Sequence, residues 1–420
     1  MRTSLDPTTL AAVESHLTAA DEHLARAYPG DDGSRQPVHT VYVPADRYHA
    51  GLAHEWGEQA RRLLADHGGT GVLLDAVGVR ADLRDVVASQ VEEKLSREPV
   101  EDLRVDLEDG YGDHPDDDED RTVLAAATAL RQDVAAGTAT PFLGIRFKSF
   151  ERDTRARGLR TLDIFVSELA GTGELPDGLV VTLPKVTSVE QVEAMVLVCD
   201  RLEVAAGLPA GRIRFEVQIE TPQAILDSTG TAMVARLVHA GAGRVSGLHY
   251  GTYDYSASLG IGAAYQSLEH PAADHAKAVM QLAVAGTGVR LSDGSTNVLP
   301  VGDGDQVRIA WANHGRLVRR SLERGYYQGW DMHPGHLPSR FAATYAFFRE
   351  GFAPAAARLQ AYVRKQEGAV MDEPATARAL AWFLRRGLDC GALGADEVSD
   401  RAGLGPADLS RMLTPSGAES

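Results

Sequence analysis

Short apolar runs recur along most of the chain, and each is bounded by turn residues. Runs of this length flanked by Gly, Pro, Asp or Asn are typical of buried β-strands. Stretches with helical spacing of apolar residues separate the runs from one another. We therefore predict eight strands, at residues 38–44, 103–110, 142–149, 178–186, 213–221, 244–254, 289–294 and 326–334.

The intervening helical patterns decide how these strands are connected. A strand followed by a helix and another strand indicates parallel strands with crossover helices. Eight such units predict an α/β fold of the (β/α)8 TIM-barrel type, and an open doubly wound sheet is the alternative. An extra apolar run at 71–77 can be a ninth strand or part of an insertion. The predicted helices are 50–66, 121–135, 159–169, 189–201, 222–240, 274–285 and 305–324.

The two ends of the chain have a different pattern. Residues 7–27 have helical spacing, with Asp6-Pro7 as a start signal and Pro29-Gly30 as a stop. After residue 352 the pattern predicts helices at 353–369 and 373–388 and a short helical pair at 394–413. We therefore divide the chain into an N-terminal helical segment (1–37), a barrel domain (38–352) and a C-terminal helical extension (353–420).

Composition narrows the class of protein. The 420 residues carry 42 Lys and Arg against 59 Asp and Glu, a formal net charge of −17. This acidity argues against a general nucleic-acid binder and against docking to anionic lipid. No apolar stretch approaches the ~20 residues that span a bilayer, and the first ten residues lack the apolar core of a signal peptide. Only two cysteines occur, Cys199 and Cys390, which excludes a disulfide scaffold and predicts a cytoplasmic location.

Polar and ionisable residues follow the apolar part of every predicted strand after the first. Catalytic groups of a TIM barrel lie at these carboxyl ends, and an unpaired charge at the end of a buried strand is costly. The concentration of such groups therefore predicts an active site. They include Glu108 and Asp109, Arg146 and Lys148, Lys185, Gln218 and Glu220, Tyr253 and Asp254, Asp293, and Asp331 with His333.

Two carboxylates on neighbouring predicted strands, Glu220 and Asp254, can converge on one cation. Oxygen-only ligands suit Mg²⁺ or Mn²⁺. Such an ion can bind the carboxylate and carbonyl of a 2-oxo acid together and stabilise an enolate, and the planar fork of Arg146 can hold the same enolate oxygen or a substrate carboxylate. The alternative for both acids is an ordinary ion pair or helix cap.

Several short motifs along the chain resemble the HpcH/HpaI aldolase and citrate lyase beta-subunit family, and they occur in the family's order. The resemblance implies a (β/α)8 barrel, a metal-dependent carbon–carbon lyase, and assembly as a trimer or hexamer. It places the metal ligands at Glu220 and Asp254 and the enolate-binding arginine at Arg146. The motifs are Val105-Asp-Leu-Glu-Asp109, Gly144-Ile-Arg146, Leu183-Pro-Lys185, Ile219-Glu-Thr221, Tyr250-Gly-Thr-Tyr-Asp254, Ser258-Leu-Gly-Ile261 and Met332-His-Pro334.

The resemblance leaves the substrate open. Gln218 matches the branch that acts on 2-oxo acids, in which a Gln precedes the metal-binding Glu by two residues. That branch also has a His after the Glu of the second strand, where this chain has Asp109, as in the acyl-CoA lyases. The base is therefore not carried over from the aldolases. Glu108 and Asp109 are candidates for holding water or relaying a proton, with simple hydrogen bonding as the alternative. Malate synthase is a further relative, so condensation is possible as well as cleavage.

Two other strand-end residues are assigned as substrate contacts. Lys185 can hold a substrate carboxylate or have a structural role, and a Schiff base at this lysine is the rival mechanism. Asp293 can contact substrate or act as a base. Gly-rich stretches such as 241–243 and 286–288 precede predicted strands, which is the wrong order for a dinucleotide fingerprint.

We therefore predict a homo-oligomeric lyase or aldolase that uses Mg²⁺ or Mn²⁺ and acts on a small oxo or hydroxy acid of the pyruvate and oxaloacetate class. An acyl-CoA lyase of the malyl-CoA, citramalyl-CoA or citryl type, using a CoA thioester, is the first alternative. A barrel that has lost catalysis and serves as a binding protein is the second.

Overall fold

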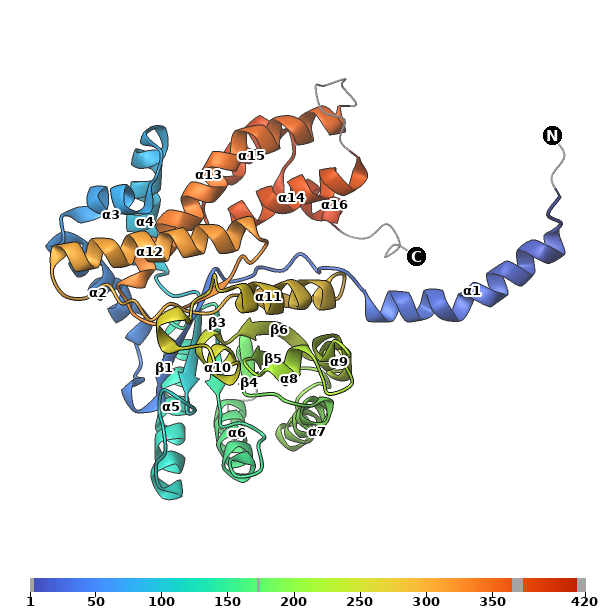
Figure 1. The fold of residues 1–420 in the computed structure, drawn as a ribbon, viewed down its shortest axis with the longest axis horizontal. Coiled ribbons are helices and arrows are strands. Elements are labelled where there is room, and N and C mark those ends of the chain that lie inside the picture. Colours follow the sequence, from blue (N-terminus) through green and yellow to red (C-terminus); the bar gives the residue numbers. More distant parts are fainter. Residues whose placement is uncertain (1–3, 172–173, 365–372, 414–420) are drawn as a thin grey trace.

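The computed structural model describes residues 4–171, 174–364 and 373–413. Eight parallel strands form its centre, and helices surround them (Figure 1). The order of hydrogen-bonded strands is β7-β6-β5-β4-β3-β2-β1-β8. The strands are β1 (His39–Pro44), β2 (Asp102–Asp106), β3 (Phe142–Arg146), β4 (Leu179–Leu183), β5 (Arg214–Ile219), β6 (Val245–Tyr250), β7 (Arg290–Ser292) and β8 (Gly329–Asp331).

The strands at the two ends of this order, β7 and β8, come together and close the sheet into a barrel. A parallel bridge joins Ser292 to Gln328, directly before β8. Beside it, the backbone N–H of Asp293 donates to the carbonyl of Gln328 at 2.8 Å. The predicted (β/α)8 barrel is therefore confirmed, and the open sheet is excluded.

The crossover helices follow the predicted order, with some changes at their ends. The predicted helix at 222–240 is two helices, because Leu226 pairs with Ala232 in an antiparallel bridge between them. The acidic run before residue 121 is itself the first turn of a helix, where carboxylates favour the helix dipole. These helices are α5 (Asp116–Ala136), α6 (Arg155–Ala170), α7 (Val189–Ala206), α8 (Pro222–Ile225), α9 (Met233–Ala240), α10 (Thr252–Ser258), α11 (Pro271–Val284) and α12 (Gly304–Glu323), with the 3-10 turn η3 (Ala263–Tyr265) between α10 and α11.

The long connection between β1 and β2 is a helical insertion. The apolar run at 71–77 lies in α3 (Gly69–Val77), so a ninth strand there is wrong and the insertion is confirmed. Gly68 and Gly78, both with positive φ, flank the helix, and Gly78 caps its end. The other elements of this connection are η1 (Ala45–Arg47), α2 (Leu52–Asp66), η2 (Ala81–Leu83) and α4 (Arg84–Arg97).

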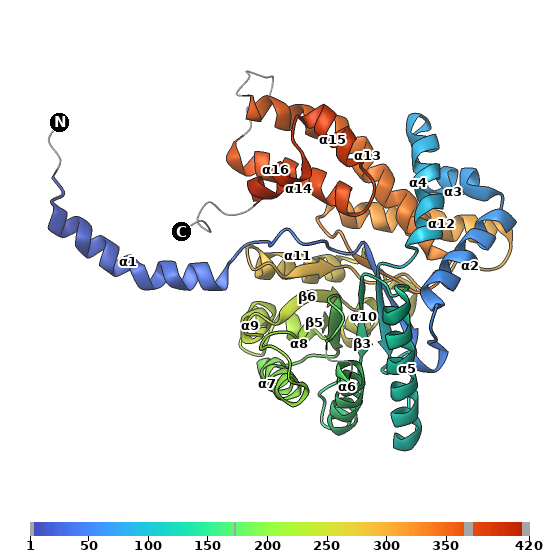
Figure 2. The ribbon, with the colours of Figure 1, turned by 180° about the vertical axis from the view of Figure 1, so that it is seen from behind.

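The helix expected from residue 353 begins much earlier. It is α13 (His336–Val363), which passes through the predicted boundary between 352 and 353 without a break; the division into domains stays a prediction. Residues 365–369 of the expected helix lie outside the described residues. The helices that follow are α14 (Pro374–Asp389), α15 (Ala395–Ala402) and α16 (Pro406–Leu413), and with the end of α13 they form a second apolar core (Figure 2).

The first helix, α1 (Pro7–Ala27), confirms the prediction at 7–27 and projects away from the rest of the chain (Figures 1 and 2). The Asp6 side chain caps its N-terminus by accepting from the backbone N–H of Thr9. Among the helices of the described residues, none is long and apolar enough to cross a membrane.

Candidate functional site

The candidate site begins with the alternation of side chains along β5. Glu216 points into the barrel, where its carboxylate accepts from Arg104 Nη2 at 3.0 Å and lies 2.9 Å from His249 Nε2. Because side chains of a strand alternate between its two faces, Gln218 and Glu220 follow on the same inward face. Glu220 thus lies just beyond the carboxyl end of β5, and its side chain is buried.

Lys185 holds the Glu220 carboxylate through its backbone. The N–H of Lys185 donates to Glu220 Oε1 at 2.7 Å. Lys185 has a φ of 50°, a left-handed conformation that is strained for a residue with a side chain. Its position two residues after the end of β4 and this strained backbone direct the N–H toward the carboxylate that follows β5.

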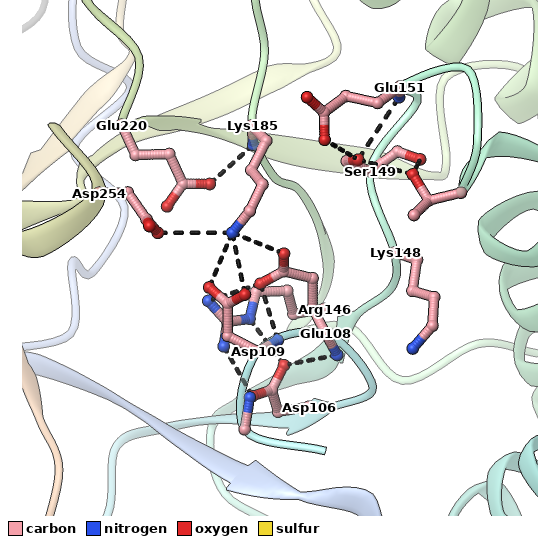
Figure 3. A network of polar contacts seen from close by, with 12 residues as sticks. Asp106, Glu108, Asp109, Arg146, Lys148, Ser149, Glu151, Lys185, Glu220 and Asp254 are labelled. Atoms are coloured by element: carbon pink, nitrogen blue, oxygen red, sulfur yellow. Dashed lines mark hydrogen bonds and ion pairs between the residues drawn. The ribbon is translucent and has the colours of Figure 1, made fainter. Parts of the chain in front are cut away.

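The ammonium group of Lys185 contacts three acids from two segments of the chain. Its Nζ lies 2.8 Å from Glu108 Oε1, 2.8 Å from Asp109 Oδ2 and 3.4 Å from Asp254 Oδ2 (Figure 3). Glu220 and Asp254 face the same space beside this lysine (Figure 3). The structure therefore brings together five of the predicted site residues: Glu108, Asp109, Lys185, Glu220 and Asp254.

Asp254 reaches this cluster from a helix and not from a strand. The predicted strand 244–254 ends at Tyr250, and Asp254 lies in the first turn of α10. Its side chain is 49% exposed. Gly251 makes the close approach possible, since a Cβ at this position would lie 2.5 Å from the Cβ of Glu220. The glycine of the Tyr250–Asp254 motif thus leaves room for the buried glutamate.

Arg146, at the end of β3, is held in one orientation. Its Nε and Nη2 donate to the two oxygens of Asp106 at 2.7 and 2.6 Å. The guanidinium also lies over the rings of Tyr42, at 4.8 Å, and Trp330, at 5.5 Å. The remaining nitrogen, Nη1, lies 3.4 Å from Glu108. Two bonds to Asp106 therefore leave Nη1 as the nitrogen that can turn to a ligand.

Burial sets the protonation of the cluster. Burial, joined by Glu108 and Asp254, raises the pKa of Glu220 to about 8 against the lowering effect of Lys185 and Arg146. Burial also raises the pKa of Glu108. Burial acts in the same direction on Asp109, but hydrogen bonds with Lys185 and Glu108 outweigh it and lower the pKa of Asp109. The cluster thus holds neighbouring carboxyl groups with opposed proton affinities, a pattern common at catalytic sites.

The donors of this cluster fit a hard divalent cation. Glu220 and Asp254 offer carboxylate oxygens only, the type that Mg²⁺ and Mn²⁺ prefer. The amide oxygen of Gln218 is buried and has no hydrogen-bond partner within the part of the chain that the structure describes. A buried unpaired acceptor costs free energy, so a polar ligand beside Gln218 would satisfy it.

The structure places Asp293 elsewhere. Both of its oxygens accept from Lys277 Nζ on α11, at 3.1 and 3.0 Å, and Oδ2 also accepts from Ser321 on α12 at 2.6 Å. These partners lie on helices outside the barrel, so the carboxylate points away from the cluster. Lys148 is also removed from it, since its Nζ donates to the carbonyls of Leu107 and Gly112.

A second group of potential ligands occurs near the end of β8. His314, Asp331 and His336 have ligand atoms within 4.8 Å of one another. However, Asp331 already accepts from Arg340 Nη2 at 2.7 Å and contacts His39 Nδ1 at 2.9 Å. The guanidinium occupies the place of a cation, so this group is a buried ion-pair network.

The sequence did not assign the residues that hold Arg146. Asp106 was part of a quoted motif without a role, and Tyr42 and Trp330 were not singled out. Asp106 stands at an inward position of β2, two residues after Arg104, whose side chain pairs with Glu216 across the barrel. The two-residue alternation of side chains along β2 is the sequence signal that places Asp106 on the same inward face as Arg104.

The comparisons with known proteins agree with this architecture. A family model described as "Domain of unknown function (DUF6986)" matches residues 17–415. The chain belongs to the DUF6986 family. No curated protein matches it in sequence.

This DUF6986 member is also similar in fold to several solved structures. A citrate lyase from Burkholderia xenovorans LB400 has a TM-score of 0.58 at 18% identity, covering 87% of this chain and 95% of its own. A citrate lyase beta subunit from Mycobacterium tuberculosis, complexed with oxaloacetate and magnesium, has a TM-score of 0.41 at 18% identity, covering 74% of this chain and 98% of its own. A Haloferax volcanii malate synthase, in a magnesium and glyoxylate complex, has a TM-score of 0.48 at 13% identity, covering 91% and 98%. The resemblance read from the sequence is thus confirmed for the fold, a citrate lyase-like TIM barrel.

Proposed function

We propose that the protein is a divalent-metal-dependent carbon–carbon lyase or aldolase acting on a 2-oxo or hydroxy acid of the pyruvate and oxaloacetate class. The observation that carries this proposal is the buried Glu220 carboxyl beside Asp254 and Lys185 at the mouth of the barrel. Glu220 and Asp254 would hold Mg²⁺ or Mn²⁺. When bound, the ion supplies positive charge that favours an enolate of the substrate.

The chain's own residues account for the rest of the reaction. In the cleavage direction, a base takes the proton of a substrate hydroxyl, the carbon–carbon bond breaks, and its electron pair moves to the enolate oxygen. Arg146 Nη1 is the donor for that oxygen, oriented by Asp106. Glu108, whose pKa burial raises, is the candidate for this base. Gln218 and Lys185 would orient the substrate carboxylate.

Asp109 favours a second candidate function. This position matches the acyl-CoA lyases, and Asp109 contacts Lys185 within the same cluster. The candidate is a lyase of the malyl-CoA, citramalyl-CoA or citryl type, built on the same enolate chemistry but acting on a CoA thioester. A homo-oligomer of three or six subunits is part of both proposals.

The test is a screen of carbon–carbon cleavage with Mg²⁺, Mn²⁺ or a chelator. We expect activity on free oxo or hydroxy acids that requires the metal, and loss of at least a hundredfold in Glu220→Gln. Activity only on thioesters selects the acyl-CoA lyase. If the protein stays fully active in the presence of a chelator and borohydride traps substrate on Lys185, the metal mechanism is contradicted. A wild-type protein that cleaves none of these substrates and retains them on binding contradicts catalysis altogether and points to a binding protein.

A further inference from the structure

Helix α1 packs against no other helix or strand among the residues that the structure describes. None of its residues from Pro7 to Ala27 is buried. Both ribbon views show it extending from the body (Figures 1 and 2). Contacts to the body begin after its C-terminal end, where the Tyr28 ring packs on His239 at 5.4 Å and the Gly30 N–H donates to the carbonyl of Gly286 at 2.8 Å.

The apolar residues of α1 form one narrow seam. Leu10, Val13, Leu17 and Leu24 are 53%, 50%, 45% and 59% exposed. With Ala20 they recur at alternating steps of three and four residues, the a and d positions of a heptad repeat. A helix that covers a globular core needs a wider stripe than these two positions. The seam therefore fits another helix with the same repeat.

The residues beside the seam indicate that this partner helix is a second copy of α1. In this heptad register, Glu14 and Asp21 fall at e positions on one flank, and His16 and His23 fall at g positions on the other. In a parallel pair, g of one helix faces the following e of the other, so His16 of one copy would face Asp21 of its mate. An antiparallel pair would place acids opposite acids, which is unfavourable. The helix is thus complementary to itself in the parallel orientation.

We propose that α1 pairs in parallel with α1 of a second copy of this chain as a short coiled coil that joins two subunits. An isolated helix of this length is marginal in water, and pairing would remove its exposed leucines from solvent. Parallel pairing leaves both barrels at the same end of the coil, next to Tyr28. The proposal does not depend on the proposed enzymatic function.

Measuring the mass of the full-length protein by light scattering tests the pairing. The variant L10E/L17E/L24E places three charges on the seam, and the matched control A12E/A19E/A25E places three on the outer face. Because each coil joins two subunits, the pairing is compatible with the proposed assembly of six subunits and not with that of three. We expect the seam variant to have half the wild-type mass and the control to keep it, with equal thermal midpoints for the barrel. A wild type that runs as a single 45.0 kDa chain, or a seam variant with unchanged mass, overturns the proposal.

Cysteine cross-linking tests the orientation and the partner. Both native cysteines are buried, which leaves an introduced thiol as the reactive one. In a parallel pair the two copies of residue 17 meet at the seam, within the Cα separation of ~4.4–6.8 Å that a disulfide spans. We expect L17C to form cross-linked dimers under mild oxidation and A19C, on the outer face, to stay uncross-linked. Absence of a cross-link in L17C, or equal cross-linking of both variants, contradicts a parallel α1 pair.

Discussion

Glu220 combines burial with a position near four other charged side chains. Burial, with Glu108 and Asp254, raises its pKa to about 8, so the metal-free protein keeps it mostly protonated at neutral pH. A divalent cation must displace this proton, because only the carboxylate is a ligand. The same residue therefore links metal binding, pH and the stability of the metal-free protein.

The pH dependence of Mg²⁺ binding follows from this linkage. Below pH 8 each Mg²⁺ bound should release about one proton, so affinity should rise about tenfold per pH unit and level off above pH 8. Isothermal titration calorimetry in buffers of different ionisation enthalpy measures both quantities. E220Q should bind Mg²⁺ at least a hundredfold more weakly. An affinity that is flat between about pH 6 and 8 would contradict the assignment.

The same shift has a definite sign for stability. In the folded protein the pKa of Glu220 lies above its ordinary value of 4.5. The contribution of Glu220 to the free energy of unfolding is therefore fully present below pH 4.5 and is lost as the pH rises through about 8. Urea unfolding of the metal-free protein should therefore show a declining free energy over this range. E220Q, which cannot ionise, should lack this decline.

Asp106 is predicted to act on the reaction by positioning other groups: it fixes Arg146, and it accepts from the backbone N–H groups of Glu108 and Gly110 at 3.0 and 2.9 Å. In D106N the buried guanidinium loses its bidentate partner, so Nη1 is no longer fixed. We expect kcat to fall about a hundredfold or more, as on loss of a donor to a developing oxyanion. D293N is the matched control, since it also breaks a buried ion pair, with Lys277, but away from the cluster. It should lower the thermal midpoint and leave kcat close to wild type; equal loss of activity in both variants would contradict these placements.

Asp293 also shows what a list of strand-end residues leaves out. The sequence identified which polar residues follow each strand, but not the face on which each one lies. Asp293 stands two residues after Leu291, on the apolar face of β7 that packs against the outer helices, whereas Glu220 follows the inward-facing Glu216 and Gln218. The alternation was present in the sequence, but the face of β7 became certain only from its partners Lys277 and Ser321.

At the scale of elements, the turn from β6 into α10 positions the second candidate metal ligand. Gly251 lies against Glu220, and a Cβ there would also meet Glu220 Oε2 at 2.8 Å. Because this Cβ would also meet Glu220's own Cβ and Cα, the clash cannot be relieved by moving a flexible side-chain end alone. The turn therefore couples the position of α10, and of Asp254, to the buried glutamate.

Gly251→Ala tests this coupling. We expect Mg²⁺ affinity and kcat/KM to fall at least tenfold, because Glu220 or α10 must shift. The control is Gly71→Ala in α3, where a Cβ meets nothing within 4 Å. Alanine in a helix interior should stabilise that variant by about 0.5–1 kcal/mol without affecting activity. Full metal affinity in Gly251→Ala would show that the close contact has no role.

Elements were easier to predict than their ends. The eight βα units follow from strand–helix alternation, which local composition encodes strongly. The helix at 69–77 was ambiguous because a short apolar run suits a strand or a buried helix equally well. Asp254 was placed on a strand because the predicted strand was extended through Gly251 and Thr252, whereas β6 ends at Tyr250.

At the scale of the whole molecule, the C-terminal helices and the candidate site lie at opposite ends of the barrel. Gln90 on α4 donates to the carbonyls of Gly391 and Ala392 at 3.1 and 3.0 Å. A cavity of about 690 Å³ lies between 388–391 and the segments 97–100 and 137–141, which precede β2 and β3. The site cluster lies where the strands end, so the C-terminal helices are placed to support the barrel and not to contact substrate.

This separation predicts that stability and activity respond differently to a change in the C-terminal core. Leu384 on α14 is fully buried in the second apolar cluster. Leu384→Ala should lower the free energy of unfolding by about 2–5 kcal/mol through lost burial and the cavity it leaves. The kcat/KM of the folded variant should stay within about twofold of wild type, since the cluster at Glu220 is unchanged. Arg378→Ala, at an exposed position of the same helix, is the control and should change neither quantity. A loss of kcat/KM in Leu384→Ala well below its unfolding transition would mean that the C-terminal core helps to shape the mouth of the barrel.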